Sequence, residues 1–299
     1  MKTREKQVLK REKFWNMSFE ELSFAVKSVL NSNAKLSKEP PKPVLNQGVT
    51  FAPGNRSGEE VCDHRTPGCF VACVLWFAGH TVTLIVRMAM IARTVFFKRF
   101  PAAFFFRLHL ELGKHLRKAQ KLGVMCVARM NVASDIWWPN SLFVCHPKIT
   151  FYDYTKDFDK AIAYGEGSLP VNLHITFSVS EETTWKQAHA LHLLGVNLAV
   201  VFNSHYNSKL HKYGVLPNHV IFTSPCGQWK FTTRVIDGNV HDVRIPEFDG
   251  RRKCVGLRAN STINGKEQGI KAGFIMPCRM GTFVRNDKVL SGVQVVVLK

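Results

Sequence analysis

The stretch KITFYDYTKD, residues 148–157, decides the fold, and two related stretches flank it: VMCVARMNVASD at 124–135 and NLHITFSVSEE at 172–182. Each has the β-branched and aromatic composition of a buried or half-buried strand, and each ends in polar residues. Further along, 181–195 has a helical pattern that stops at a glycine, and three more runs indicate strands, at 196–203, 232–238 and 253–260. Strands that alternate with helices favour parallel pairing through crossover connections. The sequence therefore predicts an α/β fold, a complete or incomplete parallel (β/α) barrel, with an open doubly wound parallel sheet as the alternative.

Polar side chains follow or end these apolar runs, at the positions where a parallel sheet builds its sites. In a barrel the carboxyl ends of all strands meet at one face, so such residues converge there. Polar residues also end strands simply because turns are polar. The candidate catalytic residues are Asp135, Asp153, Lys156, Glu181 and Asp237.

The ends of the predicted domain are set by composition. Residues 1–43 are rich in lysine, and we expect a basic N-terminal arm or helix there, with Ser18 and Glu21 at the spacing of a capping box. Residues 44–299 are expected to form a single α/β domain. Within it, 101–123 predicts a helix that begins at Pro101, stops at Gly123 and exposes a basic face.

The amino-acid composition indicates what class of protein this is, but it does not indicate an activity. The chain has 299 residues, 45% of them hydrophobic, so most of it should fold. Its 41 Lys and Arg against 22 Asp and Glu give a net charge of +19, which attracts polyanions such as nucleic acid. Eight cysteines are too few for a secreted disulfide scaffold and predict a reducing, cytosolic setting.

Three cysteines crowd the segment CDHRTPGCFVACVLWFAGHTVTLIV, residues 62–86. Cys62, Cys69 and Cys73 have the spacing C-x6-C-x3-C, and thiolates suit zinc or an iron–sulfur cluster. Ordinary buried cysteines are the alternative. We take Cys278 as the fourth metal ligand, and the other candidates for that position are Cys226, His64 and His80.

The same segment is uncharged from residue 69 to residue 86, which is long enough to cross a bilayer. A helix buried in a large protein has the same hydropathy, and arginines follow at once in a continuing helical pattern. We therefore expect no membrane association.

Several blocks together resemble a known family. VTFAPGNRSGEEVCDHRTPGCFVACVLWFAG, NVASDIWW, ITFYDYTK, LHITFSVSE and VIDGNVHDVRIPEFDG are similar to successive blocks of an uncharacterised tailed-bacteriophage family, and more distantly to the mycobacteriophage family named for gene product eighty-eight. The resemblance covers residues 44–260. It implies a phage or prophage origin and action in the host cytoplasm, and it strengthens the metal hypothesis for the three cysteines. This chain departs from the family after the third cysteine, where TVTLIV replaces a more polar segment.

Two hypotheses of function remain. The first is an enzyme with a cysteine-bound metal or iron–sulfur cluster that acts on nucleic acid or a nucleotide-like polyanion. The second is a non-catalytic phage accessory protein that binds nucleic acid or a host factor through its basic surface. Radical S-adenosylmethionine enzymes also join a cysteine cluster to a parallel α/β barrel, but their C-x3-C-x2-C pattern fails here, because Trp76 stands where the third cysteine belongs.

Overall fold

The computed structural model describes residues 11–77, 83–204, 206–207, 212–213, 215–259, 262–276 and 294–298. Most described strands belong to one sheet of eleven strands. Its central strands are β2 (Val44–Val49), β3 (Met125–Arg129), β4 (Thr150–Thr155), β5 (Leu173–Ser178), β6 (Asn197–Phe202), β11 (Cys254–Arg258) and β10 (Lys230–Asp237). These seven are parallel to their neighbours in that order.

Antiparallel strands form both edges of the sheet. β1 (Leu30–Asn31) pairs with β2, while β9 (His219–Thr223) pairs with β10 and with β13 (Gln294–Leu298). The short β12 (Ile275–Met276) adds to β6, and β7 (Tyr206–Asn207) with β8 (Lys212–Tyr213) forms a separate ribbon. The mixed α/β class and the mostly parallel sheet are therefore confirmed. A closed barrel is not, because in the described residues the antiparallel edge strands keep β2 and β10 apart and the sheet stays open.

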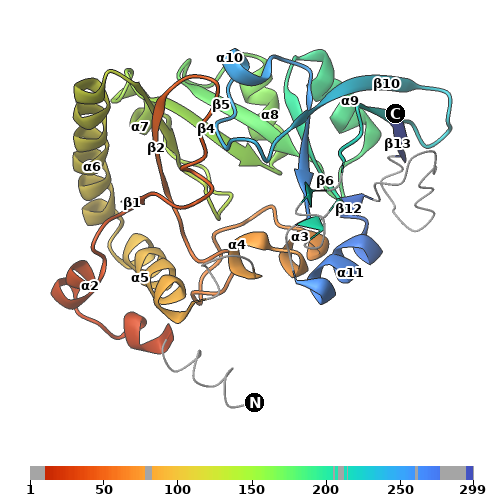
Figure 1. Cartoon of the computed structure of the whole chain (residues 1–299). Helices are drawn as coiled ribbons and strands as arrows, with labels where there is room; N and C mark the ends of the chain where they lie inside the picture. The colour runs from red at the N-terminus through yellow and green to blue at the C-terminus, as the bar shows by residue number, and fades with distance from the viewer. Residues whose placement is uncertain are drawn as a thin grey trace.

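The strands from β2 to β6 follow one another both in the chain and in the sheet. Right-handed crossovers that always step in the same direction place their helices on one face. The helices are α6 (Pro101–Leu122), α7 (Asn140–Val144), α8 (Phe158–Gly165) and α9 (Trp185–Leu193), and α6, α8 and α9 pack against the strands (Figure 1). The predicted helix at 101–123 is confirmed, with Pro101 in its first turn and Gly123 in the left-handed conformation at φ +66°.

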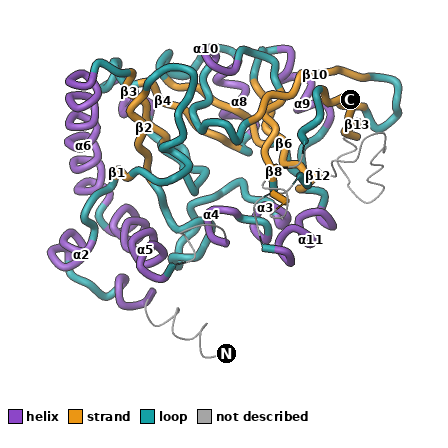
Figure 2. The backbone as a smooth tube through the Cα atoms, viewed as in Figure 1, coloured by secondary structure: helices purple, strands orange, loops and turns teal. Residues whose placement is uncertain are grey.

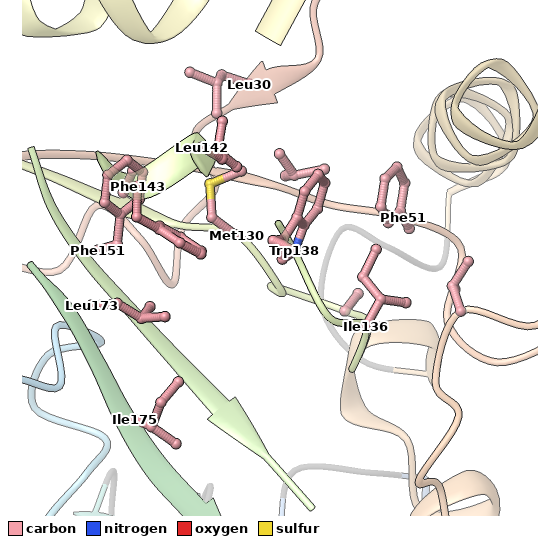
Figure 3. Close-up of a cluster of buried hydrophobic side chains, with 14 of the residues drawn as sticks. Leu30, Phe51, Met130, Ile136, Trp138, Leu142, Phe143, Phe151, Leu173 and Ile175 are labelled. Atoms are coloured by element: carbon pink, nitrogen blue, oxygen red, sulfur yellow. The ribbon is translucent and has the colours of Figure 1, made fainter. Parts of the chain in front are cut away.

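The main hydrophobic core lies between the sheet and these helices. Phe151 on β4 faces it together with Leu173 and Ile175 on β5, since alternate residues of a strand point to the same face. Figure 3 shows Phe151 beside Phe143, with Leu173 and Ile175 following one another along the neighbouring strand. The residues between them, such as Tyr152 and Tyr154, therefore point to the opposite face, where the candidate site lies.

The N-terminal segment packs against the sheet. It contains α2 (Phe19–Ala25), whose cap is the expected capping box of Ser18 and Glu21, and then β1. Leu22, Val29 and Leu36 are fully buried. The segment predicted as an arm or helix thus provides one wall of the structure, while the domain boundary at residue 43 stays a prediction.

A long segment joins β2 to the helical layer at the carboxyl ends of the strands. Figure 2 shows that it is mostly loop, interrupted by the short helices α3 (Pro67–Val71) and α4 (Val74–Phe77), before α5 (Leu84–Arg99) begins. Two further helices, α10 (Pro246–Asp249) and α11 (Ile263–Ala272), precede and follow β11, and α11 packs beside α3 (Figure 1). None of the helices in the described ranges is long and apolar enough to cross a membrane.

Candidate functional site

A cavity of about 860 Å³ lies on the face of the sheet that the crossover helices leave uncovered, and it reaches beyond the strand ends. Its walls come from the N-terminal segment, the loop after β2, the start of α5 and the strands from β3 to β11. This volume is in the range of sites for small molecules and cofactors. Polar side chains at the ends of parallel strands do meet there, as the sequence predicts.

The three clustered cysteines line this cavity together. Cys62 accepts a hydrogen bond from the backbone N–H of Gly54 at 3.2 Å, and its thiol donates to the carbonyl of Ala133 at 3.5 Å. Burial raises the pKa of Cys62 to about 12, and burial followed by the nearby Cys69 raises that of Cys73 to about 11. Both thiols are therefore protonated at neutral pH unless a metal or another cation stabilises the thiolate.

The cysteine-bearing helix is fixed by Glu181. One carboxylate oxygen accepts the backbone N–H of Gly68 at 2.6 Å, and the other accepts the hydroxyl of Thr66 at 2.8 Å. Thr66 in turn caps α3 by accepting the N–H of Cys69. Glu181, predicted as catalytic, therefore holds the loop that carries Cys69 and is not among the described residues that line the cavity.

Two glycines allow this packing. A Cβ on Gly68 would lie 2.6 Å from the Cβ of Phe274, so only glycine lets α3 approach the end of α11 this closely. Gly54, at φ +62°, turns the loop so that its N–H meets Cys62. The spacing of four residues would place Cys69 and Cys73 one turn apart on a single helix. Cys69 lies within α3, but Cys73 follows the end of that helix, so the two cysteines do not share one helix.

Lys156 and Asp135 are the two predicted catalytic residues that line the cavity beside the thiols. Asp135 accepts the hydroxyl of Thr155 at 2.6 Å and the backbone N–H of Lys156 at 2.7 Å. The ammonium of Lys156 lies close enough to Cys69 for the two groups to interact electrostatically. Burial lowers the pKa of Lys156, but Cys69 and Asp135 outweigh it, and the net shift is upward. Lys156 is thus a fixed positive charge next to the cysteines.

The other two candidates have structural partners. Asp153 points toward the core side of β4, where it accepts the backbone N–H of Asn131 at 2.7 Å, and burial raises its pKa to about 6. Asp237 pairs with Arg258 at 2.6 Å and accepts the N–H of Asn239 in the turn after β10. Neither is among the described residues that line the cavity.

Arginines and aromatic rings alternate along the cysteine loop. Arg56 lies over the rings of Phe70 and Trp76, at 4.5 and 5.1 Å from their centroids. Arg65 lies over Phe70 at 4.2 Å, and Arg87 over Trp76 at 4.7 Å. Burial lowers the pKa of Arg56, against the influence of Cys73. Arg56 therefore adds a second positive charge near Cys62 and Cys73, besides that of Lys156.

The fourth metal ligand remains open. Cys278 and His80 lie outside the described residues. Cys226 is exposed in the turn between β9 and β10, and the ring of His64 lies 3.3 Å from the carboxylate of Asp157. In the described part of the chain, no three His, Cys, Asp or Glu side chains converge closely enough to hold one metal ion.

A buried ionic network occupies the floor of the cavity, and sequence reasoning missed it. Lys35 from the N-terminal segment lies 3.0 Å from Asp242, and Arg129 on β3 lies 3.1 Å from the same carboxylate. The hydroxyl of Tyr152 also donates to Asp242, at 2.9 Å. Lys35 and Arg129 together hold the pKa of Asp242 far below its usual range, although burial acts in the opposite direction. An arginine inside the apolar run CVARM is the one signal that the sequence offers for this network.

The comparisons with known proteins identify the family. The family model described as Gene product 88 matches residues 26–276, which is most of the chain. The chain belongs to the Gene product 88 family. This is a phage-associated family of unknown function, so the resemblance that the sequence indicates is confirmed and carries no activity with it. No curated protein and no solved structure matches the chain.

Proposed function

We propose that this member of the Gene product 88 family is an iron–sulfur enzyme. Cys62, Cys69 and Cys73 would bind a four-iron cluster at the mouth of the cavity, and the cavity would hold a small anionic substrate. The observation that carries the proposal is that three thiols and a half-buried lysine line the wall of a cavity large enough for a ligand.

A cluster requires its thiols to stand further apart than zinc does. Tetrahedral zinc, with Zn–S bonds of about 2.3 Å, brings its thiolates to about 3.8 Å from one another. Cys62, Cys69 and Cys73 line one cavity, and no three His, Cys, Asp or Glu side chains of the described residues converge on a single metal ion, which disfavours one zinc held by these three thiols. The irons of a four-iron cluster sit at separate corners of a cube, so their thiolates stand further apart than those on one zinc ion.

The charges near the thiols also suit a cluster. Binding requires three thiolates, and their negative charge needs compensation in a partly buried site. Lys156 lies near Cys69, and Arg56 lies near Cys73 and Cys62. With three protein ligands, a four-iron cluster would keep one iron without a protein ligand and available to bind a substrate.

Cations outnumber carboxylates on the described part of the cavity wall. They include Lys35, Arg93, Arg129, Lys156 and Arg258, whereas Asp135 is the carboxylate among the described lining residues. Such a wall attracts an anionic substrate. The volume of the cavity suits a nucleotide-sized molecule better than a nucleic acid duplex. We also propose that the protein acts in the host cytoplasm, where iron–sulfur clusters survive.

Iron and sulfide analysis of anaerobically purified protein tests the proposal. We expect about four irons and four sulfides per chain, and loss of both in Cys62→Ser, Cys69→Ser and Cys73→Ser. Cys145→Ser is the matched control, since Cys145 is exposed and is not among the described lining residues. Protein that holds one zinc and no sulfide would refute the cluster.

Electron paramagnetic resonance of the reduced protein separates the enzyme from the accessory protein. A cluster signal that changes when a ligand is added indicates an open iron. A change on adding S-adenosylmethionine would extend the proposal to that enzyme class, and an unchanged spectrum would exclude the class while leaving the cluster in place. Metal-free protein whose cysteine variants keep full stability would instead support the non-catalytic accessory protein, whose basic surface includes the exposed face of α6 with Lys114, Arg117 and Lys118.

A further inference from the structure

The ionic network on the cavity floor carries an excess of positive charge. Ion pairs join three cations, Lys35, Arg129 and Arg244, and two carboxylates, Asp242 and Asp249, in this network. His241 adds no charge at neutral pH, because burial and then the neighbouring Arg244 lower its pKa to about 4. Three positive and two negative charges leave a net charge of +1.

A buried charge without a counterion is unfavourable, because the protein interior does not solvate it as water does. The side chains of Asp242 and Arg129 are 1% and 6% exposed, so water compensates little of the excess. Lys35 is different, since its side chain is 33% exposed and lines the cavity. A ligand in the cavity can therefore reach the network at Lys35.

Arg129 has unused hydrogen-bonding capacity. Its Nη1 donates to both oxygens of Asp242 at 3.1 Å, whereas its Nε is buried and lacks a hydrogen-bond partner among the described residues. The hydroxyl of Tyr154, whose ring lies 4.7 Å from the guanidinium, is also buried without a partner there. Orphaned buried polar groups cost stability. The two atoms themselves are closed to solvent, but the Arg129 side chain lines the cavity and is 6% exposed, so a ligand there can contact the guanidinium.

We propose that Lys35 and Arg129 bind the carboxylate group of a small substrate whose apolar body fills the rest of the cavity. This assignment of a substrate class rests on the proposed function, although the binding itself does not require the cluster. A carboxylate matches the network in charge, since its single negative charge balances the excess of one positive charge. Its planar pair of oxygens also matches the donor geometry of a guanidinium edge.

The size of the ligand follows from the strand geometry. Arg129 lies opposite Tyr152 in the sheet register. Lys156, which lies near Cys69, is four residues after Tyr152 and directly follows the end of β4. Four residues of a strand span about 13 Å. A molecule of roughly that length would reach from the carboxylate site to the cysteines, and the apolar side chains of Val179, Ala199 and Leu257 line the cavity around it.

Titration calorimetry with three probes that share one aromatic body tests the proposal. Naphthoate, naphthamide and naphthyl phosphate differ in the polar group, so their affinities for the anaerobically purified protein report what the site recognises. We expect naphthoate to bind most tightly. Lys35→Met should weaken naphthoate binding about tenfold, the effect of losing one charged hydrogen bond, and leave naphthamide unchanged.

Lys38→Met is the matched control, because Lys38 also lines the cavity and carries the same charge but donates to the backbone carbonyl of Asn239. It should change naphthoate affinity less than twofold, and Lys35→Arg should restore most of the affinity. Thermal unfolding of each variant confirms that it folds. Equal binding of naphthoate and naphthamide would overturn the proposal, as would equal losses in the two lysine variants. Tighter binding of naphthyl phosphate that depends on Lys35 would overturn the assignment to carboxylates.

The same titration on Cys69→Ser separates this proposal from the proposed function. Naphthoate binding that depends on Lys35 in iron-free protein supports the carboxylate site and not the cluster. Protein that holds iron and sulfide but does not distinguish naphthoate from naphthamide supports the cluster and refutes the carboxylate site.

Discussion

Replacing Glu181 by glutamine tests whether this carboxylate holds the cysteine loop. Glutamine keeps one carbonyl oxygen but puts an NH2 group where the second oxygen accepts a hydrogen bond, either from the backbone N–H of Gly68 or from the hydroxyl of Thr66. A hydrogen bond to a charged group contributes about 1.5–3 kcal/mol, so we expect Glu181→Gln to lower the free energy of unfolding by about 2 kcal/mol.

The expected change in melting temperature follows from the size of the chain. Unfolding entropy is about 2.1 cal/mol/K per residue, or about 0.6 kcal/mol/K for 299 residues, so 2 kcal/mol corresponds to a decrease of about 3 °C. Denaturant and thermal unfolding measure the two quantities. If the proposed cluster is present, the variant should also lose iron faster than the wild type when exposed to a chelator, because α3 carries Cys69.

Glu182→Gln is the control for this prediction. Glu182 is the exposed neighbour of Glu181, and its removal should change stability by less than about 0.5 kcal/mol. The anchoring role of Glu181 is refuted if the two variants unfold and release iron alike.

Three further predictions follow from the site. Lys156→Gln should lower the midpoint potential of the proposed cluster and Lys156→Arg should retain it, because a positive charge next to Cys69 favours the reduced state. Redox titration followed by paramagnetic resonance measures the potential, and equal potentials in the wild type and both variants would contradict this prediction. Burial and Arg244 lower the pKa of His241 to about 4, so its imidazole is neutral in the folded protein. The unfolded pKa is about 6.5, so the stability that His241 contributes is complete above pH 6.5. This contribution decreases as pH falls from 6.5 to about 4, by up to about 3 kcal/mol. Denaturant unfolding between pH 7 and pH 4 measures this decrease in stability. The decrease should be smaller in His241→Gln. If the substitution leaves the pH dependence of stability unchanged, His241 is not its cause. Gly68→Ala should cost about 1–3 kcal/mol, because the new Cβ would lie 2.6 Å from the Cβ of Phe274, and wild-type melting behaviour would show that α3 and α11 can separate without cost.

The sequence by itself determined the local elements and the class of the fold. Hydrophobic and β-branched runs predicted the strands from β3 to β6, and Pro101 and Gly123 predicted the limits of α6, because these features depend on neighbours along the chain. The same reasoning predicted that Asp135 and Lys156 meet at the strand ends, since parallel strands bring their carboxyl ends to one edge.

Only the tertiary structure decided the closure of the sheet and the roles of the charged residues. Antiparallel strands at both edges leave the sheet open, and no local pattern encodes which strands become edges. Glu181 and Asp153 turned out to hold loops, and Lys35 from the supposed arm meets Asp242 in the cavity floor. The physical reason is that a charged group takes its role from the partner beside it after folding, and that partner comes from a distant part of the chain.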